Sequence, residues 1–296
     1  MKEFTELTVN GLANGAVLAI TALGFVLIYK ATEVINFAQG QFLVVGAFMV
    51  YTAENDWGLP WPAAVAVGIA TGIVLGVAVE RLILRRMIGE ATLSVIMVTI
   101  GLASALAGVA LGVWGAQGKQ GPSFIPAGRV KLFGSGEDAV FVAANRLWAV
   151  GIATVVLIAV GLFFQKSRHG IAMRAVADDQ QAAMVQGISV NRIFAMAWAL
   201  AGAAGAVGGV LLASIAGSYG IELQAFAVFV FPVVILGGLD SVPGTVVGGV
   251  IVGLLVEYSK FYLSVSASVI IPFAALVLIL LIKPYGLFGQ VRIERV

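Results

Sequence analysis

Long apolar runs without Asp, Glu, Lys or Arg dominate the chain. They cover residues 7–29, 34–53, 57–79, 91–118, 147–165, 193–221, 223–239, 241–256 and 261–282. A helix needs about 20 apolar residues to cross the hydrocarbon core of a bilayer, and all runs except 223–239 and 241–256 approach or exceed that length. Those two are short and contain Pro and Gly, so they predict either two short spans or a re-entrant pair. The pattern therefore predicts an all-α integral membrane protein, a polytopic helical bundle of eight or nine membrane segments.

Composition agrees with a membrane environment. Of the 296 residues, 60% are hydrophobic and 11% are charged, whereas a soluble domain carries about 25% charged residues. Glycine is abundant, at 37 residues, and small residues let helices in lipid approach closely. Gly-x-x-x-Gly spacings occur at Gly11/Gly15, Gly72/Gly76, Gly108/Gly112, Gly244/Gly248 and Gly249/Gly253. Each spacing alone is weak evidence in a glycine-rich chain, but together they favour a tightly packed bundle.

The residues that common enzymatic and metal sites require are missing. The chain has no cysteine, a single histidine (His169) and no phosphate-binding loop ending in Gly-Lys-Ser/Thr. Its net charge of +2 gives no reason to expect a nucleic-acid partner. We therefore expect a transport subunit that is not an enzyme and binds no cofactor itself, so that ATP, if used, is bound by partner subunits.

An ion-coupled secondary carrier is the alternative from another class, because such carriers titrate ionisable groups within the membrane. The candidates for such a role are Glu222, Asp240 and Glu257. All three lie at the ends of apolar runs, and Glu257 can pair with Lys260 one turn on. This placement at the ends of the runs favours a transport subunit that is powered by partner subunits over an ion-coupled carrier.

Uncharged polar residues inside the apolar runs are candidates for a translocation path. They are Asn14, Asn36, Gln39, Gln41, Ser94 and Thr99. The simpler interpretation of any one of them is a hydrogen bond between helices, which contributes about 0.6 kcal/mol on average. The cluster at 36–41 is harder to explain in this way, since it brings three amide side chains and Gly40 to the cytoplasmic start of a membrane segment. It predicts a broken or water-lined helix end.

The distribution of Lys and Arg predicts the orientation. If the N-terminus lies outside and nine segments cross, the cytoplasmic side receives 11 of the 17 basic residues, as the positive-inside rule requires. These are Lys30, Arg81, Arg85, Arg86, Lys166, Arg168, Arg174, Arg192, Lys283, Arg292 and Arg295. The C-terminus is then cytoplasmic, and the chain forms a single transmembrane domain over residues 1–296.

Two loops between the runs are long. Residues 115–145, rich in Gly and Pro, are expected to be extracytoplasmic. Residues 166–192 are expected to be cytoplasmic, and the stretch Ile171–Gly187 has helical spacing without Pro. Gly187 stands where a left-handed glycine would end that helix. The sequence therefore predicts one short cytoplasmic helix between two spans.

Several of these segments resemble one known family. They are GFVLIY at 24–29, VINFAQGQFLVVGAF at 34–48, RAVADDQQAAMVQGI at 174–188 and ILGGLDSVPGTVVGG at 235–249. In these runs the chain is similar to the branched-chain amino acid permeases of the ATP-binding cassette (ABC) importers. The motifs are specific to the permease family and much less so to its substrate, so other small solutes such as urea, short amides or aromatic acids remain alternatives.

This resemblance implies a cytoplasmic coupling segment that docks on an ATPase subunit. Its residues would be Arg174, Asp178, Asp179, Gln181, Ala182, Ala183 and Gly187. The general motif of ABC importers has glutamate where this chain has Gln181, and only its Ala-Ala and Gly spacing is retained. The charged stretch also has a simpler interpretation, namely a solvated loop held inside by the positive-inside rule.

The resemblance also implies partners and a location. A second permease subunit, related or identical, two cytoplasmic ATPase subunits and an extracytoplasmic solute-binding protein would complete an importer in the bacterial inner membrane. The mechanism it implies is alternating access, in which closure of the ATPases moves the coupling segment and tilts the permease helices around a central path.

Overall fold

The computed structural model describes residues 2–87, 90–134 and 139–289. Seven helices within these ranges are long and apolar enough to cross a membrane. They are α1 (Lys2–Thr32), α3 (Trp61–Leu82), α4 (Thr92–Trp114), α5 (Ala144–Lys166), α8 (Val190–Ala216), α11 (Val242–Tyr262) and α12 (Val265–Ile282). The helical membrane bundle is confirmed, whereas the count of eight or nine segments is not.

The remaining elements are short. The helices are α2 (Gln39–Tyr51), the π-helix η1 (Thr52–Asp56), the 3₁₀ turns η2 (Leu84–Met87) and η4 (Ala227–Phe229), α6 (Arg168–Asp178), α7 (Gln180–Val185), α9 (Leu223–Phe226) and α10 (Val230–Gly237). The strands are β1 (Lys119–Gln120), β2 (Arg129–Phe133), β3 (Val140–Ala143) and β4 (Ser218–Tyr219). They form two antiparallel pairs, β1 with β4 and β2 with β3.

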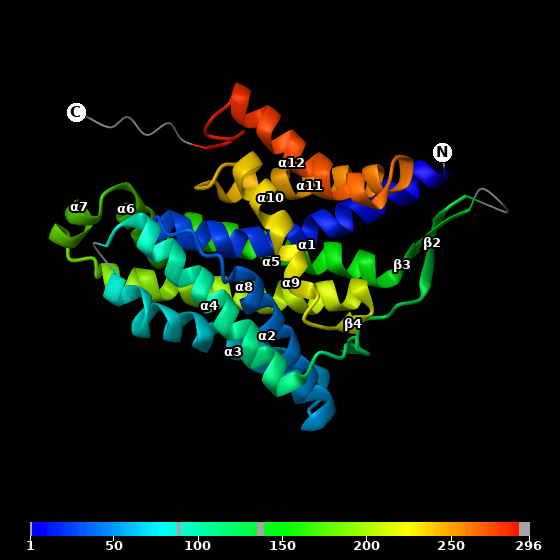
Figure 1. Cartoon of the computed structure of the whole chain (residues 1–296), viewed down its shortest axis with the longest axis horizontal. Coiled ribbons are helices and arrows are strands. Elements are labelled where there is room, and N and C mark those ends of the chain that lie inside the picture. The colour runs from blue at the N-terminus through cyan, green and yellow to red at the C-terminus, as the bar shows by residue number, and fades with distance from the viewer. Residues whose placement is uncertain (1, 88–89, 135–138, 290–296) are drawn as a thin grey trace.

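The two ends of the bundle differ in what they carry. In Figure 1, α6 and α7 lie at the left end, whereas the N-terminus and β2, β3 and β4 lie at the right end.

The pairing of β1 with β4 ties the 115–145 loop to the end of α8. Tyr219 of β4 is fully buried there, and this burial, with the nearby Glu54 carboxylate, raises the pKa of its phenol. Residues 135–138 of that loop, and the C-terminal residues 290–296, lie outside the described residues.

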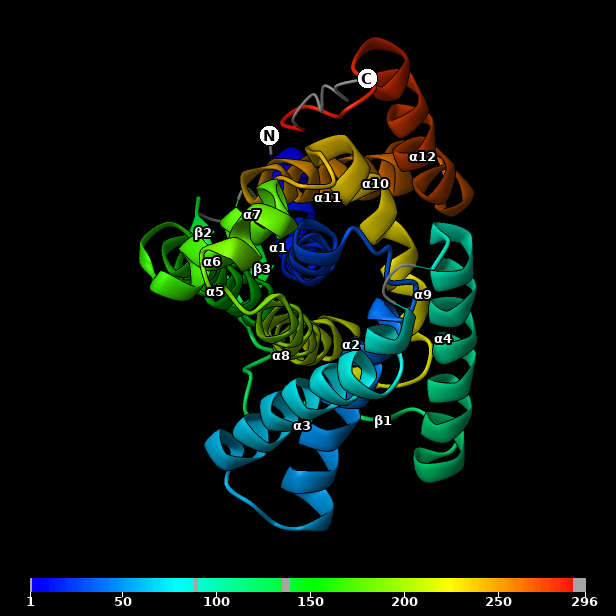
Figure 2. The same cartoon turned by 90° about the vertical axis from the view of Figure 1, so that its left-hand side faces the viewer.

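The helices α1 and α8 form the centre of the bundle, and their apolar windows are the most buried of the seven. Each of these two helices packs against helices that follow the other one in the chain. The helix α1 packs along α11, whereas α8 packs along α3 and α2. Figure 2, which looks along the bundle, shows α10 and α11 beside α1, and α2 and α3 beside α8. The centre of the bundle thus consists of two intertwined units, α1–α2–α3 and α8–α10–α11.

Glycines make both of these close packings possible. A Cβ atom on Gly15 would collide with the backbone of Gly249, and one on Gly72 would collide with the backbone of Gly202. The order of the contacts shows that α1 runs antiparallel to α11 and α3 antiparallel to α8. The helix α1 is also antiparallel to α8, because Gly24 meets Ala201 whereas Thr21 meets Gly208. The two units therefore have opposite directions, which is the arrangement of an inverted repeat.

The Gly-x-x-x-Gly prediction holds for four of the five spacings. Gly11 and Gly15 meet Gly253 and Gly249, and the pairs Gly72/Gly76 and Gly244/Gly248 also contact neighbouring backbone. The exception is Gly108/Gly112 on α4, where an added Cβ atom would meet nothing within 4 Å. Among the described residues, that face of α4 therefore has no packing partner.

Two apolar runs end differently from their expected limits. The run 34–53 was expected to span, but regular helix begins only at Gln39, and α2 is left with 13 residues. The run 241–256 was expected to be short, but α11 continues to Tyr262. It passes through Glu257, whose buried carboxylate accepts a hydrogen bond from Asn14 of α1. The hydrogen bond from Asn14 on another helix, rather than a contact with Lys260, thus stabilises Glu257 inside the span.

Candidate functional site

An unwound segment separates α1 from α2. Glu33, which follows α1, has a φ of +57°, a left-handed conformation that non-glycine residues seldom adopt. Asn36 then accepts a hydrogen bond from the backbone N–H of Ala38 (3.0 Å) and donates one to Gln39 (3.3 Å). These local bonds compete with helix formation. The predicted broken helix end is therefore present, and strained backbone of this kind is typical of functional sites.

The amide of Gln39 fixes this segment to the centre of the bundle. Its Nε2 donates to the carbonyl oxygen of Ala201 on α8, at 3.2 Å. The side chain fits there because Gly24 of α1 has no Cβ atom, which would otherwise occupy the position of the amide nitrogen. Both polar functions of Gln39 are thus used inside the protein, so this residue anchors the break.

The helix α4 supports the same segment from the outside. Thr99 is fully buried, and its hydroxyl accepts the amide of Phe37 (3.4 Å). The same hydroxyl shares its hydrogen between the carbonyl oxygens of Ile96 in its own helix (2.9 Å) and Ile35 (3.2 Å). Ser94, one helical turn before, is exposed. Asn14 lies in the first half of α1, several turns away from the break, and pairs with Glu257. Of the six path candidates, four therefore gather at the break, while Asn14 and Ser94 lie elsewhere.

A second broken segment faces the first. After β4 the chain forms α9, η4 and α10 in place of one continuous helix. It meets the start of α2 where Gln41 Nε2 donates to Gln224 Oε1 at 2.5 Å. Beside this bond, a Cβ atom on Gly40 would lie 2.7 Å from the Cβ of Ala227. Gln224 was not among the sequence candidates, because nothing in a single sequence pairs it with Gln41; its place in a Pro- and Gly-broken run was the only available signal.

A cavity of about 250 Å³ lies between the two broken segments. Its lining combines side-chain amides with aromatic and aliphatic groups. The residues are Asn36, Gln39, Gly40, Gln41 and Gln224, followed by Phe25, Phe37, Ala227, Val228, Val230 and Phe231. Phe231 packs against Phe37 and Phe25, with ring centroids 5.1 Å and 5.7 Å away. The cavity is therefore amphipathic and its wall carries no charged side chain.

The predicted coupling segment forms two helices, not one. The chain breaks at Asp179, whose carboxylate accepts the backbone N–H groups of Gln181 (2.8 Å) and Ala182 (2.9 Å) and so caps α7. Gly187 has the expected left-handed conformation, with a φ of +80°. The amide of Ile188 bonds back to the carbonyl of Ala183, as in a glycine-terminated helix end.

The residues proposed for coupling do not share one face. Ala183 is buried against Met173 and Ile193, so a large side chain there would disturb folding before it disturbed docking. Arg174 lines a separate cavity with Lys30. Asp178, Asp179, Gln181, Ala182 and Gly187 are exposed. Two residues that the sequence did not single out are also exposed on α7: Met184 at 55% and Val185 at 86%.

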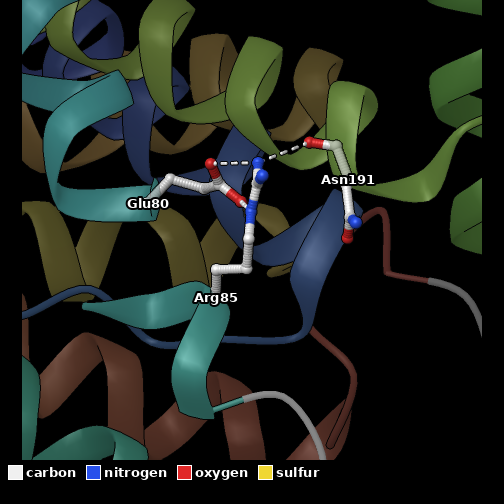
Figure 3. A network of polar contacts seen from close by, with 3 residues as sticks. All are labelled: Glu80, Arg85 and Asn191. Carbon is white, nitrogen blue, oxygen red and sulfur yellow. Dashed lines mark hydrogen bonds and ion pairs between the residues drawn. The ribbon is translucent and has the colours of Figure 1, made fainter. Parts of the chain in front are cut away.

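An ion pair between a half-buried arginine of η2 and a buried glutamate of α3 lies at this end, and the arginine also reaches the start of α8. Figure 3 shows Arg85 of η2 directed at Glu80, with its guanidinium also reaching the backbone of Asn191. The two bonds to Glu80 measure 2.8 and 2.9 Å, and the bond to the carbonyl oxygen of Asn191 measures 3.3 Å. Glu80 is 1% exposed. The pair borders a cavity of about 210 Å³. Glu33 of the unwound segment and Gln180 of α7 also line this cavity.

Removing the arginine should destabilise the protein markedly. Arg85→Ala leaves a buried carboxylate without its counter-ion, which costs about 2–3 kcal/mol when the lost partner is partly exposed. Glu80→Gln should cost less, since an amide can still bond to the guanidinium. Thermal unfolding in detergent measures both. A larger loss for Glu80→Gln than for Arg85→Ala would contradict the assigned role of the arginine.

Comparisons with known proteins agree with this architecture. The family described as "Branched-chain amino acid transport system / permease component" matches residues 7–280. The chain belongs to this family. It is 29% identical to the high-affinity branched-chain amino acid transport system permease protein LivH of Escherichia coli K12, over 99% of this chain and 98% of that protein. It is 28% identical to BraD of Pseudomonas aeruginosa, again over 99% of this chain and 98% of that protein.

A more distant relative in the comparisons has another solute in its name. The fructose import permease protein FruF of Bifidobacterium longum is 27% identical over 91% of this chain and 72% of that protein. The family membership thus shows a multi-pass membrane permease component of a transport system. It does not by itself fix the solute.

Proposed function

We propose that the chain is the membrane-spanning permease subunit of an ABC importer for branched-chain amino acids, and that solute passes between the two broken segments. The observation that carries this proposal is the amphipathic cavity, whose lining combines amides with aromatic and aliphatic side chains. Discontinuous helices at the interface of inverted repeats are where transporters commonly bind their solute. The family and the LivH and BraD relatives support the choice of solute.

Energy would come from partner subunits. The exposed apolar side chains of Met184 and Val185 stand on α7, at the same end as α6. Apolar surface of this kind on an aqueous helix favours a protein partner. Two cytoplasmic ATPase subunits that bind ATP would dock there, a second permease copy or relative would complete the path, and an extracytoplasmic solute-binding protein would deliver the solute.

The proposed location is the bacterial inner membrane, with the N-terminus outside and α6 and α7 in the cytoplasm. Because the chain has no native cysteine, accessibility labelling has no background. A cysteine replacing the exposed His169 of α6 should react with an impermeant thiol reagent only in inside-out vesicles. One replacing the exposed Val130 of β2 should react in intact cells. Reaction of the cysteine at 169 in intact cells would overturn the orientation.

The choice of solute is tested by uptake. Complexes reconstituted with the cognate ATPases and binding protein should accumulate leucine, isoleucine and valine when ATP is supplied, and should not accumulate fructose or urea. FruF makes another solute the leading alternative. Uptake of fructose without leucine would replace the proposed solute, and leucine uptake driven by an ion gradient without ATP would replace the proposed energy source.

A further inference from the structure

The cavity between α2 and α9–η4 contains an unpartnered polar atom. Gln41 is 6% exposed, and its Nε2 is used by Gln224. Its Oε1 is buried and has no hydrogen-bond partner among the described residues. Leaving a buried acceptor without a donor costs free energy. The atom itself has almost no accessible surface, but Gln41 lines the cavity, so a rotation of its amide would bring Oε1 to a donor on a ligand there.

We propose that this cavity is a binding site for the amino acid in transit, which it holds as a zwitterion. This inference rests on the proposed function. The ammonium group, with three N–H donors, would bond to the side-chain oxygens of Gln41 and Gln224. It would thereby take over the acceptor on Gln224 that Gln41 now uses, so ligand binding would open the amide bridge between the broken segments.

The carboxylate and the side chain of an amino acid also have complementary groups in this cavity. The first turn of α2 begins at Gln39 in the cavity wall, and a helix N-terminus carries partial positive charge that favours a carboxylate. The apolar lining residues Phe25, Val228 and Phe231 would hold a branched aliphatic side chain. Because no charged side chain lines the cavity, it favours a net-neutral ligand over a basic or acidic amino acid.

Protection from thiol labelling tests the site in the assembled importer. Val228→Cys places a reactive group in the exposed part of this cavity, and Val246→Cys places one in the separate cavity beside Arg174. Millimolar free leucine should slow labelling at 228 at least severalfold and leave labelling at 246 unchanged. Isocaproate, which has leucine's carbon skeleton without the ammonium group, should protect much less.

Gln41→Leu and Gln224→Leu test the two ammonium acceptors. Loss of one hydrogen bond to a charged group should weaken leucine protection and lower the uptake rate by about tenfold or more. Gln165→Leu, which changes an exposed glutamine near Arg174, is the matched control and should transport normally.

The outcomes separate this inference from the proposed function. Leucine uptake without protection at 228, or equal protection by isocaproate, would overturn the site while leaving the importer assignment intact. Normal uptake by both glutamine variants would do the same. Failure of the unaltered complex to take up leucine at all would instead overturn the proposed function, and this inference with it.

Discussion

Replacing Val185 by glutamate is expected to abolish uptake and to make ATP hydrolysis by the assembled complex insensitive to the ligand-loaded binding protein. Val185 is 86% exposed on α7, so the substitution disturbs no internal packing. It places a charge in the centre of the proposed ATPase contact, and buried interface positions tolerate unpaired charge poorly. The amount of membrane-inserted protein should not change.

The control is Gln186→Glu, which adds the same charge to the adjacent exposed position without removing apolar surface. ATPase rates with and without binding protein, together with co-purification of the ATPase subunits, measure the effect. If the Val185→Glu complex retains its ATPases and responds to ligand as the unaltered complex does, α7 is not the coupling contact.

The second large effect is expected at the contact between α3 and α8. Gly202→Val would place two methyl groups where the backbone of Gly72 lies. Overpacking of this kind typically costs about 1–3 kcal/mol, and more where the obstacle is backbone rather than a flexible side chain. We expect little or no monodisperse protein, and a strongly lowered unfolding temperature for any that is recovered.

Gly108→Val provides the matched comparison, because an added side chain on that face of α4 meets no atom within 4 Å. Thermal unfolding and size-exclusion profiles in detergent should be close to those of the unaltered chain. Equal behaviour of the two variants would mean that α3 and α8 do not pack through Gly72 and Gly202.

The membrane bundle could be predicted from the sequence because one physical requirement dominates it. Lipid excludes charge, so uninterrupted apolar runs locate most helices closely. The same rule predicts an end at residue 256, whereas α11 continues through Glu257 to Tyr262. A sequence shows the charge but not the partner, and Asn14 is 243 positions away. The break was predictable because Asn36 forms its hydrogen bonds locally, with Ala38 and Gln39.

The faces of the short cytoplasmic helices were not predictable in the same way. Gly187 identified a helix end through its own backbone preference, and this was correct. Whether Ala183 or Val185 points outward depends on how α7 lies against α6 and α8, and Ala183 proved to be the buried one. Gln224 was missed for the related reason that its partner, Gln41, lies in the other unit of the repeat.

The central claim is that solute passes between α2 and α9–η4, and a reversible cross-link tests it most directly. A Cβ atom on Gly40 would lie 2.7 Å from the Cβ of Ala227, about 1 Å closer than in a relaxed disulfide. A pair of cysteines at these positions can therefore be bridged once the two segments shift slightly apart, and the chain has no other cysteine. The oxidised double variant should take up no leucine, and a reductant should restore uptake, while neither single variant responds to oxidant. Undiminished ATP-driven leucine uptake by the fully cross-linked complex would contradict the claim.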